Sequence, residues 1–481
     1  MILVASQIFP ESDPRLASLT DRKIMKRTVF YTLLLMLVPA ALIQAQPIDL
    51  PTALEQSKVN YPLLKARQMD VQSADQDVLA AKSEYIPRLA VQHQYTYGTS
   101  NSVAGSFYPN PAVISPSGGI RAENTYVATW GSFTSTLMEW NVFNFGRVSA
   151  NVSAAKAGLA STQAAYENEL FQHQVRVADA YLLALIANRL TRIQESNLQR
   201  ARRFKEVVGA GVRSGMRPGV DSSLANAEYT KAEMLVLETT RNAQTQLLQL
   251  AEFSGVIGNT LPAPDSMRFF SGLPLLPDTS TTSLNPILSL YDARARQSAA
   301  RSTAIRRSYL PSISLVGAAW ARGSGISPAD DSFHTSFNDG TEYSAYNYMF
   351  GASTRWNLTD IIPISHRYRS ERYHYARDRE QYNDQRLKLQ RQRRESEIHY
   401  ALMLEQASRA PVQLAAAQRA YRQASARYSS GLTDLPTMLQ SMVTLSRAEA
   451  DMAIAYSNTW RALLAIAAAK GDLNIFLQAI Q

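Results

Sequence analysis

The same pattern of residues occurs twice in this chain of 481 residues, and it constrains the fold more than any single motif. Five residues recur 216 positions later: Trp140, Tyr166, Gly215, Glu233 and Gly255 return as Trp356, Tyr382, Gly431, Glu449 and Gly471. Pro62 and Pro87 recur as Pro286 and Pro311, at a spacing of 224. The copies differ by eight residues, which fall between Pro87 and Trp140. A fixed period with one variable loop indicates that a whole structural unit was duplicated.

Composition is compatible with two large folded units. A chain of this length ordinarily contains about three domains, but the duplication fits two repeats better, at residues 46–265 and 266–481. Hydrophobic residues make up 46% of the chain and charged residues 19%, which is typical of a folded protein. The absence of cysteine excludes disulfides, thiolate nucleophiles, thiolate zinc sites and a lipid-modified N-terminal cysteine.

Residues 1–45 are predicted to be a signal peptide. Lys26 and Arg27 precede an almost wholly apolar stretch at 29–42, and Ala45 supplies a small residue for cleavage. The apolar stretch is shorter than the roughly 20 residues of a membrane-spanning helix. Met25 is a possible true start, because residues 1–24 do not resemble a signal. The alternative is a retained N-terminal anchor helix.

Two strand hairpins are predicted, at about 87–142 and about 310–358. Between 346 and 358, Tyr346, Tyr348 and Phe350 alternate with polar residues, and 89–97 alternates similarly except that His93 interrupts the apolar face. Strands of a membrane barrel show this apolar-out, polar-in pattern. A half-buried strand of a soluble sheet shows it too, so the pattern alone leaves both interpretations open.

The rest of each repeat is predicted to be helical, with a short helix followed, after the strands, by a long helical hairpin at about 147–255 and about 364–472. Residues 147–210 contain no proline and could extend about 100 Å as a helix. Apolar residues at three- and four-residue steps favour coiled-coil packing over a globular core. The predicted seams contain Leu224, Ala227, Met234 and Leu237 in the first repeat and Leu435, Leu439, Met442, Leu445, Met452 and Tyr456 in the second. Pro411 has no counterpart in the first repeat, and it predicts a kink or a break.

The turns between paired helices are the best local candidates for a binding site. Gly215 and Gly431 can end a helix with positive φ, and a proline follows each of them a few residues later. A plain helical turn explains these residues completely. It does not explain Met216 and Leu432 at an exposed tip, which favour a contact with another protein.

These segments, in this order, resemble the outer-membrane efflux protein family of TolC-like channels. The stretches that carry the resemblance are Trp140 to Arg147, Tyr428 to Leu435, Asn60-Tyr61-Pro62 and Asn285-Pro286. The resemblance implies an α+β membrane protein and a homotrimer. In it, four strands per chain close a trimeric 12-stranded transmembrane β-barrel that continues as a long α-helical coiled-coil periplasmic tunnel.

The need for assembly also follows from physics. A four-stranded sheet in lipid would expose two unpaired edges, whose backbone groups each cost several kcal/mol, so other chains must close it. This argument permits a dimeric barrel of eight strands as well as a trimeric one of twelve. Only the resemblance selects the trimer.

The implied function is the outer-membrane channel component of a tripartite efflux or type I secretion system in a Gram-negative bacterium. The channel would be a passive duct for substrates of an inner-membrane RND, ABC or MFS-type exporter, reached through a periplasmic adaptor, and its barrel would lie in outer-membrane lipid. The residues implied to dock the adaptor are Arg213, Gly215, Met216, Gly431, Leu432 and Thr433.

The gate at the periplasmic end is less clear from the resemblance. In the best-known member, carboxylates stand six and nine residues after the second tip glycine, where this chain has Thr437 and Gln440. Asp221 lies six residues after the first tip glycine, and Asp434 lies near the second. Our hypothesis is a gate of hydrogen bonds or of Asp221 in place of an acidic ring.

Other classes of function have weaker support. No catalytic residue, metal or cofactor is predicted, because the six histidines lack metal-site spacing and the Gly209-Ala210-Gly211 segment follows a helix instead of a strand. Residues 366–394 carry ten Arg or Lys against four Asp or Glu, but an exported chain rarely meets nucleic acid. That run is better explained as a solvated helix face, near lipid headgroups or the duct. The alternative function is an exported coiled-coil scaffold without channel activity.

Overall fold

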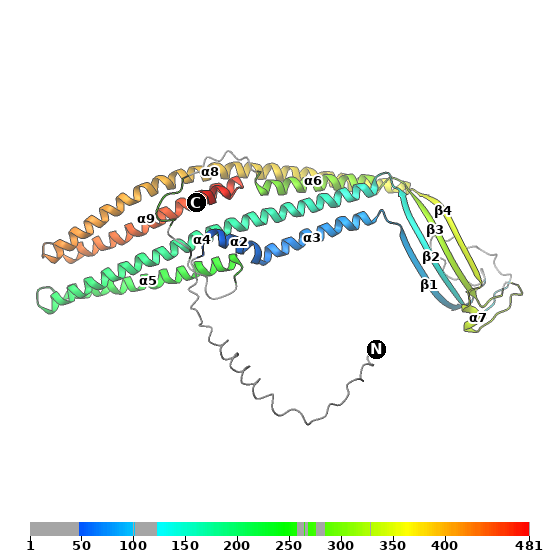
Figure 1. Cartoon of the computed structure of the whole chain (residues 1–481), viewed down its shortest axis with the longest axis horizontal. Coiled ribbons are helices and arrows are strands. Elements are labelled where there is room, and N and C mark those ends of the chain that lie inside the picture. Colours follow the sequence, from blue (N-terminus) through cyan, green and yellow to red (C-terminus); the bar gives the residue numbers. More distant parts are fainter. Residues whose placement is uncertain are drawn as a thin grey trace, which may run out of the picture.

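The protein is an elongated bundle of helices with a small β-sheet at one end (Figure 1). The computed structural model describes residues 48–99, 101, 123–256, 264, 268–275, 284–327 and 329–480. The predicted signal peptide, Met25 and most of the loop at 98–124 lie outside the described residues. The sheet and the turns of the two helical hairpins lie at opposite ends of the molecule.

Four antiparallel strands form the sheet, in the order of the sequence. They are β1 (Arg88–Gly98), β2 (Thr129–Phe143), β3 (Ser312–Ser324) and β4 (Ala345–Arg355). Trp140 of β2 lies opposite Leu315 of β3, so the hairpins of the two repeats join in one sheet. A short helix, α7 (Phe337–Thr341), packs beside β2 and β3. The outer edges of β1 and β4 pair with no other described strand.

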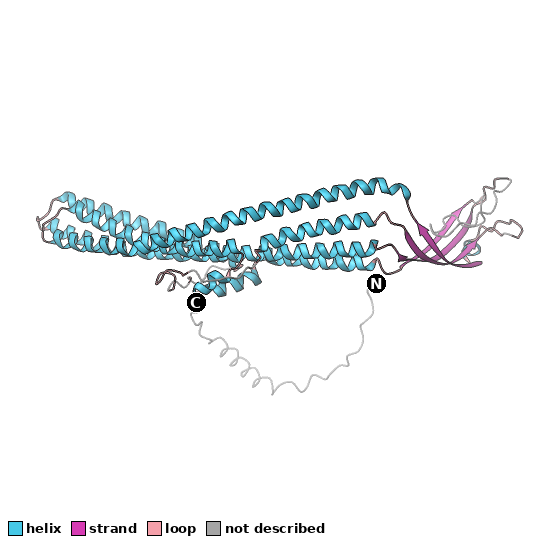
Figure 2. Cartoon of the chain, turned by 90° about the horizontal axis from the view of Figure 1, so that it is seen from above, coloured by secondary structure: helices cyan, strands magenta, loops and turns pink. Residues whose placement is uncertain are grey.

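The helices pack differently in two sections along the long axis of the molecule. Near the sheet, α3 (Pro62–Ser83), α4 (Arg147–Arg213), α6 (Pro286–Arg307) and α8 (Ile361–Ser429) pack in that order. Figure 2 shows the helices running lengthwise to the sheet at one end. Away from the sheet, α4 pairs with α5 (Gly219–Ser254) and α8 with α9 (Leu435–Lys470). The remaining elements are α2 (Leu50–Asn60), η1 (Leu358–Asp360) and α10 (Asn474–Ile480).

The repeated tryptophans make the same contact in both halves. The indole N–H of Trp140 donates to the Tyr85 carbonyl at 3.0 Å, and that of Trp356 donates to the Tyr309 carbonyl at 3.2 Å. Each bond ties the end of a strand hairpin to the turn that precedes it. The internal two-fold repeat is therefore a repeat of contacts as well as of residues.

Glycine is required at the ends of both α5 and α9 for the same reason. Gly255 and Gly471 have φ of 68° and 80°, a conformation that costs other residues roughly 1–2 kcal/mol. A Cβ at Gly255 would lie 2.7 Å from the Asn60 carbonyl carbon, and one at Gly471 would lie 2.6 Å from Asn285 Cα. Only glycine lets each hairpin pack this closely on the residues that precede α3 and α6.

The largest hydrophobic core lies at mid-length, where α2 packs on α4, and α10 on α9. Its fully buried members include Tyr181, Leu463 and Phe476. The sequence predicted coiled-coil packing in place of a globular core, and it did not separate α2 and α10 from the repeat. These two short helices produce the core, because they cover α4 and α9 with large side chains.

The predicted apolar seams differ between the repeats. Leu435, Met442 and Leu445 of α9 are buried, as predicted. The prediction for α5 is wrong for this single chain, because Leu224 and Leu237 are 42% and 70% exposed. The physical reason is that α9 packs on both α8 and α4, whereas α5 packs mainly on α4 and leaves its other side open.

Helix α8 continues through Pro411 without a break. Of the predicted kink or break, the break does not occur. Proline removes only one hydrogen bond, and α8 packs on α9 along the hairpin. The kink stays a prediction. The buried residues Ala407 and Ala410 belong to this packing. In the described part of the chain, no helix has the length and hydropathy to cross a membrane.

Candidate functional site: sheet faces, helical tips and junction cavity

One face of the sheet is apolar at both edge strands. The register places Val91 of β1 and Tyr348 of β4 on the same face, through Thr136 and Ala319 of the middle strands. The exposed apolar side chains of this face on the edge strands are Leu89, Val91, Tyr95, Tyr97, Tyr346, Tyr348 and Phe350. The alternation predicted for 89–97 is therefore present in the structure, and that predicted for 346–358 is present only as far as Arg355, where β4 ends.

His93 lies on the apolar face and bonds to two neighbouring hydroxyl groups through Nδ1. Its Nδ1 lies 2.5 Å from the Thr134 hydroxyl and 3.3 Å from the Tyr343 hydroxyl, and the two hydroxyls also bond to each other. The three side chains thus satisfy one another, which lowers the cost of a histidine on this face.

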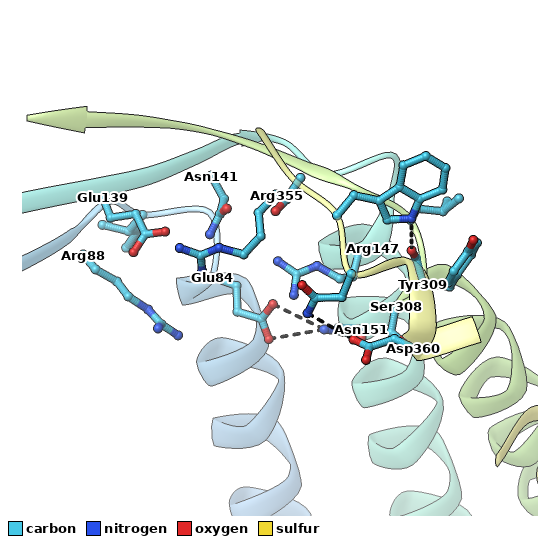
Figure 3. Close-up of a pocket in the computed structure, with 15 residues that line it drawn as sticks. Glu84, Arg88, Glu139, Asn141, Arg147, Asn151, Ser308, Tyr309, Arg355 and Asp360 are labelled. Carbon is cyan, nitrogen blue, oxygen red and sulfur yellow. Dashed lines mark hydrogen bonds between the residues drawn. The ribbon is translucent and has the colours of Figure 1, made fainter. Parts of the chain in front are cut away.

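The opposite face is mostly polar on the edge strands, although the middle strands place Phe133, Leu137 and Trp320 there. At its helix end this face continues into a cavity of about 410 Å³ at the junction of strands and helices (Figure 3). Its charged lining residues are Glu84, Arg88, Glu139, Arg147, Arg355 and Asp360. They come from the end of α3 and from β1, β2, α4, β4 and η1, so both repeats contribute. No single stretch of sequence predicts this cavity.

The two helical tips have the same backbone. Gly215 and Gly431 each have φ of 73°. The next N–H in each tip reaches back five residues, from Met216 to the Gly211 carbonyl at 3.0 Å and from Leu432 to the Arg427 carbonyl at 2.8 Å. This is the bonding of a Schellman helix end. Met216 is 78% exposed and Leu432 68%.

A cation–π contact and a hydrogen bond join the two tips. The Arg217 guanidinium donates to the Tyr428 carbonyl at 2.8 Å, and it lies 3.8 Å from the centroid of the Tyr428 ring. Tyr428 is buried against Phe204, with ring centroids 5.3 Å apart. Burial raises the pKa of the Tyr428 phenol. The sequence analysis placed Tyr428 at a tip but did not pair it with Arg217, because nothing local shows that the tips meet.

The predicted gate residues lie in different settings. Asp221 is half-buried in the first turn of α5, and its charge contributes to the raised pKa of Tyr428. Asp434 caps α9 by accepting from the Thr437 N–H at 3.3 Å, and hydrogen bonds from Thr437 hold the pKa of this carboxyl below its usual value. Gln440 is exposed on α9. Of the four, Asp221 is the one whose charge acts on Tyr428, which belongs to the link between the tips.

The other predicted docking residues lie on the exposed rim of the tips. Arg213 ends α4 with its side chain exposed, and Thr433 lies half-buried between Leu432 and the cap of α9.

Two ion pairs join α4 to α9 on the side of the tips that faces the sheet. Arg200 holds Glu449 with two bonds, at 3.0 and 2.7 Å, and Arg461 holds Asp179 at 2.7 and 3.3 Å. Side chains of the first pair are only 18% and 21% exposed. Glu449 was noted in the sequence as the repeat of Glu233. Its partner Arg200 is far away along the chain and was not predicted.

The basic run at 366–394 is mostly exposed along α8. Several of its cations have acidic partners on the same helix, such as Arg377 with Asp378 at 2.7 Å and Lys388 with Asp384 at 2.7 Å. Among the described residues, no group of three or more His, Cys, Asp or Glu side chains is placed to hold a metal ion.

A family model described as "Outer membrane efflux protein" matches residues 53–256 and 283–472 of this chain. The chain belongs to this family. The two matched segments correspond to the two repeats of helices and strands described above. No curated protein matches the chain.

Solved structures of membrane channels and of an outer-membrane protein have the same fold. CusC matches with a TM-score of 0.72 at 14% identity, over 89% of this chain and 93% of the other. VceC from Vibrio cholerae matches with a TM-score of 0.68 at 16% identity, over 88% and 96%. The open state of MtrE from Neisseria gonorrhoeae matches with a TM-score of 0.65 at 15% identity, over 88% and 89%.

The predicted family and fold class are thus confirmed. The fold is that of the TolC-like trimeric channels, an α+β membrane fold in which four strands from each chain belong to a twelve-stranded transmembrane barrel and long helices continue it as a tunnel. Family membership places the protein among outer-membrane efflux channels. The matching structures of OprN, CmeC and MtrE are outer-membrane channels.

Proposed function

We propose that three copies of this chain form a passive exit duct of a tripartite efflux or type I secretion system. The barrel would lie in the outer membrane of a Gram-negative bacterium and the helices in its periplasm. An inner-membrane exporter of the RND, ABC or MFS type would drive transport through a periplasmic adaptor. The observation that carries the proposal is a sheet whose edge strands have one apolar and one mostly polar face, and whose two outer edges pair with no other described strand.

The long helices support assembly independently of the sheet. Leu224 and Leu237 on the open side of α5 are exposed, and so are Ile398, Leu402 and Val412 on α8. Helices α5 and α8 lie in different hairpins, and their hairpin partners α4 and α9 pack against each other. This leaves α5 and α8 on the two outer sides. Two different apolar edges on one chain are what a closed ring of head-to-tail copies requires.

The tips are proposed to dock the adaptor through Arg213, Gly215, Met216, Gly431, Leu432 and Thr433. An exposed methionine and an exposed leucine at equivalent turns provide two similar apolar contacts. Such contacts fit a partner that presents apolar side chains between helices.

We further propose that the contact between Arg217 and Tyr428 holds the periplasmic end closed, with Asp221 beside it. Separating the two hairpins would break this contact before it broke the ion pairs of α4 with α9. Asp434 and Thr437 would serve mainly to cap α9, and Gln440 remains a candidate on the exposed side of that helix.

Single-channel recording in planar bilayers tests the proposed function. A channel predicts stable stepwise conductance and a trimer on gels that dissociates on heating. An exported scaffold predicts a protein that is soluble in the periplasm and gives no conductance, and this result would refute the duct.

Cross-linking tests the docking surface. The chain has no cysteine, so Met216→Cys and Leu432→Cys each introduce a single reactive group. Both variants should capture the same periplasmic adaptor in intact cells, while Leu248→Cys on exposed α5, far from the tips, should not. Equal capture by all three would contradict docking at the tips.

A further inference from the structure

We propose that an arginine band at the sheet end of α6 and α8 binds the headgroups of anionic phospholipids in the periplasmic leaflet of the outer membrane. The band consists of Arg306, Arg307, Arg369 and Arg372. The proposal rests on the function of a duct, because it requires the apolar face of the sheet to lie in lipid and the helices to begin at the membrane surface.

The two repeats carry different charges where the helices meet the sheet. In the second repeat, residues 297–310 and 360–373 contain six arginines and two acids, a net charge of +4. The equivalent residues of the first repeat, 73–86 and 144–157, contain three basic and three acidic residues, a net charge of zero. The excess of positive charge beside the sheet therefore belongs to the second repeat alone.

The acids and the cations at the start of α8 lie on different sides of the helix. Asp360 lines the junction cavity, on the mostly polar side of the sheet. At about 100° per residue, Glu371 lies on the same side as Asp360, while Arg369 and Arg372 lie about 180° and 120° away from it. The next acid on the side of the arginines, Glu380, lies about 12 Å further along α8 than Arg372. The outer side of α8 thus carries cations that no acid beside them balances.

Exposed apolar residues on that side of α8 mark where the lipid would end. Ile361 and Ile362, at the start of the helix, are 48% and 64% exposed. Arg369 follows Ile362 by about two turns, and Arg372 follows Ile361 by about three, so each arginine lies below an isoleucine on the same side. Apolar side chains followed by cations are the order in which a protein surface leaves a membrane.

The direction of α8 brings its two guanidinium groups closer to the membrane. The helix begins at the sheet, and side chains of an α-helix lean towards its N-terminus. Arg369 and Arg372 lie about 11–17 Å along the helix from the isoleucines. Since an arginine is long enough to cover most of this distance, and charges act over about 10 Å in salt, both lie within range of the headgroups.

The end of α6 adds the other two cations. Arg306 and Arg307 are exposed in the last turn of α6, which packs on α8. The Arg307 guanidinium donates to the Phe145 carbonyl at 2.8 Å, beside the rings of Phe143 and Phe145, which are 51% and 39% exposed. The one acid of α6, Asp292, lies in its other half.

A phosphate headgroup matches this band in charge and in chemistry. A guanidinium donates two parallel N–H groups to phosphate oxygens. An anionic headgroup is favoured over a zwitterionic one, because the zwitterion brings a cation of its own to a surface that is already positive.

Native mass spectrometry of the full-length channel in detergent tests the proposal. Phosphatidylglycerol is the probe, and phosphatidylcholine with the same acyl chains is the control lipid. We expect the wild-type protein to bind phosphatidylglycerol in preference, and about tenfold more salt to weaken that preference. The variant with Arg369→Gln and Arg372→Gln should lower the preference about tenfold or more, since each cation near the headgroups attracts them separately.

Two further variants separate the band from the overall charge. Arg419→Gln with Arg422→Gln removes the same charge from exposed positions of α8, about 70 Å further along the helix, and should leave the preference unchanged. Ser365→Glu adds an acid between Ile362 and Arg369 on the outer side and should lower the preference. It keeps all four arginines, so it also tests the proposal if the first variant does not assemble.

The outcomes are distinguishable. Stable conductance without a preference for phosphatidylglycerol, or with an equal loss of it in both double variants, would overturn the arginine band and leave the duct intact. A preference that Ser365→Glu does not change would also contradict the band. Absence of conductance in the wild-type protein would instead refute the proposed function.

Discussion

The contact between the tips gives a quantitative prediction for gating. The Arg217 guanidinium donates to the Tyr428 carbonyl and also stacks on the Tyr428 ring. A hydrogen bond from a charged group contributes about 1.5–3 kcal/mol, and a cation–π contact near the surface contributes about 0.5–1 kcal/mol. Arg217 is half-buried, so water screens part of both, and we estimate about 2 kcal/mol in total.

Arg217→Ala should therefore favour separated tips. A loss of about 2 kcal/mol corresponds to about a 30-fold change in the ratio of open to closed channels. Single-channel recording without adaptor measures this ratio as open probability. Arg217→Lys should give an intermediate value, since lysine keeps the charge over the ring but loses the planar guanidinium.

Arg427→Ala is the matched control. The Arg427 guanidinium also donates to a carbonyl at a tip, that of Leu432, at 3.4 Å. Unlike Arg217 and Tyr428, however, both residues belong to the second tip. Its removal should leave open probability within about twofold, because it does not join the two hairpins. An unchanged open probability in Arg217→Ala, or an equal rise in Arg427→Ala, would refute the proposed closure.

Three further predictions concern stability. Gly255→Ala should lower the free energy of unfolding by more than Gly215→Ala. Both residues have positive φ, but only a Cβ at position 255 would lie against backbone, and such overpacking costs roughly 1–3 kcal/mol. Thermal unfolding compares the two variants. Arg200→Ala and Glu449→Ala should show a coupling energy of about 1 kcal/mol or more in a double-mutant cycle, because their half-buried pair has two bonds. His173 is buried with a lowered pKa, owing first to burial, so stability should fall as the pH drops below about 6.5, the pKa of the unfolded histidine. His173→Leu, which copies the residue at the equivalent place in the second repeat, should remove this acid sensitivity in denaturant titrations at pH 7.5 and 5.

Each of these has a contrary result. Equal destabilisation by the two glycine variants would mean that backbone conformation, and not close packing, explains the repeat at Gly255. Additive effects of the two charge variants would show that the ion pair contributes little. Acid sensitivity that persists in His173→Leu would move its cause to another group.

Much of the fold was predictable from the sequence because strands, helices and turns are determined by residues that are close together along the chain. Alternation over 346–358 depends on the two-residue period of a strand, and the turns at Gly215 and Gly431 depend on a conformation that glycine favours. The duplicated spacing made each of these signals count twice. The apolar periodicity of α9 was equally informative.

The candidate site was less predictable because its parts are far apart in sequence. The same periodicity that marked α9 also marked α5, but one lies between two helices and the other lies at an open edge. Arg217 and Tyr428 look ordinary in the sequence, and so do Arg88, Arg147 and Arg355. Only their positions in space bring them together.

The sequence by itself determined the duplicated architecture and its family, since periodicity, turn glycines and repeat spacing are local properties of the chain. The tertiary structure alone decided how the two hairpins lie against each other, which seam is open for another copy, and which charges share a cavity. These depend on the packing of elements more than 100 residues apart, which no local pattern encodes. The contact of the two tips and the junction cavity both arise from that packing.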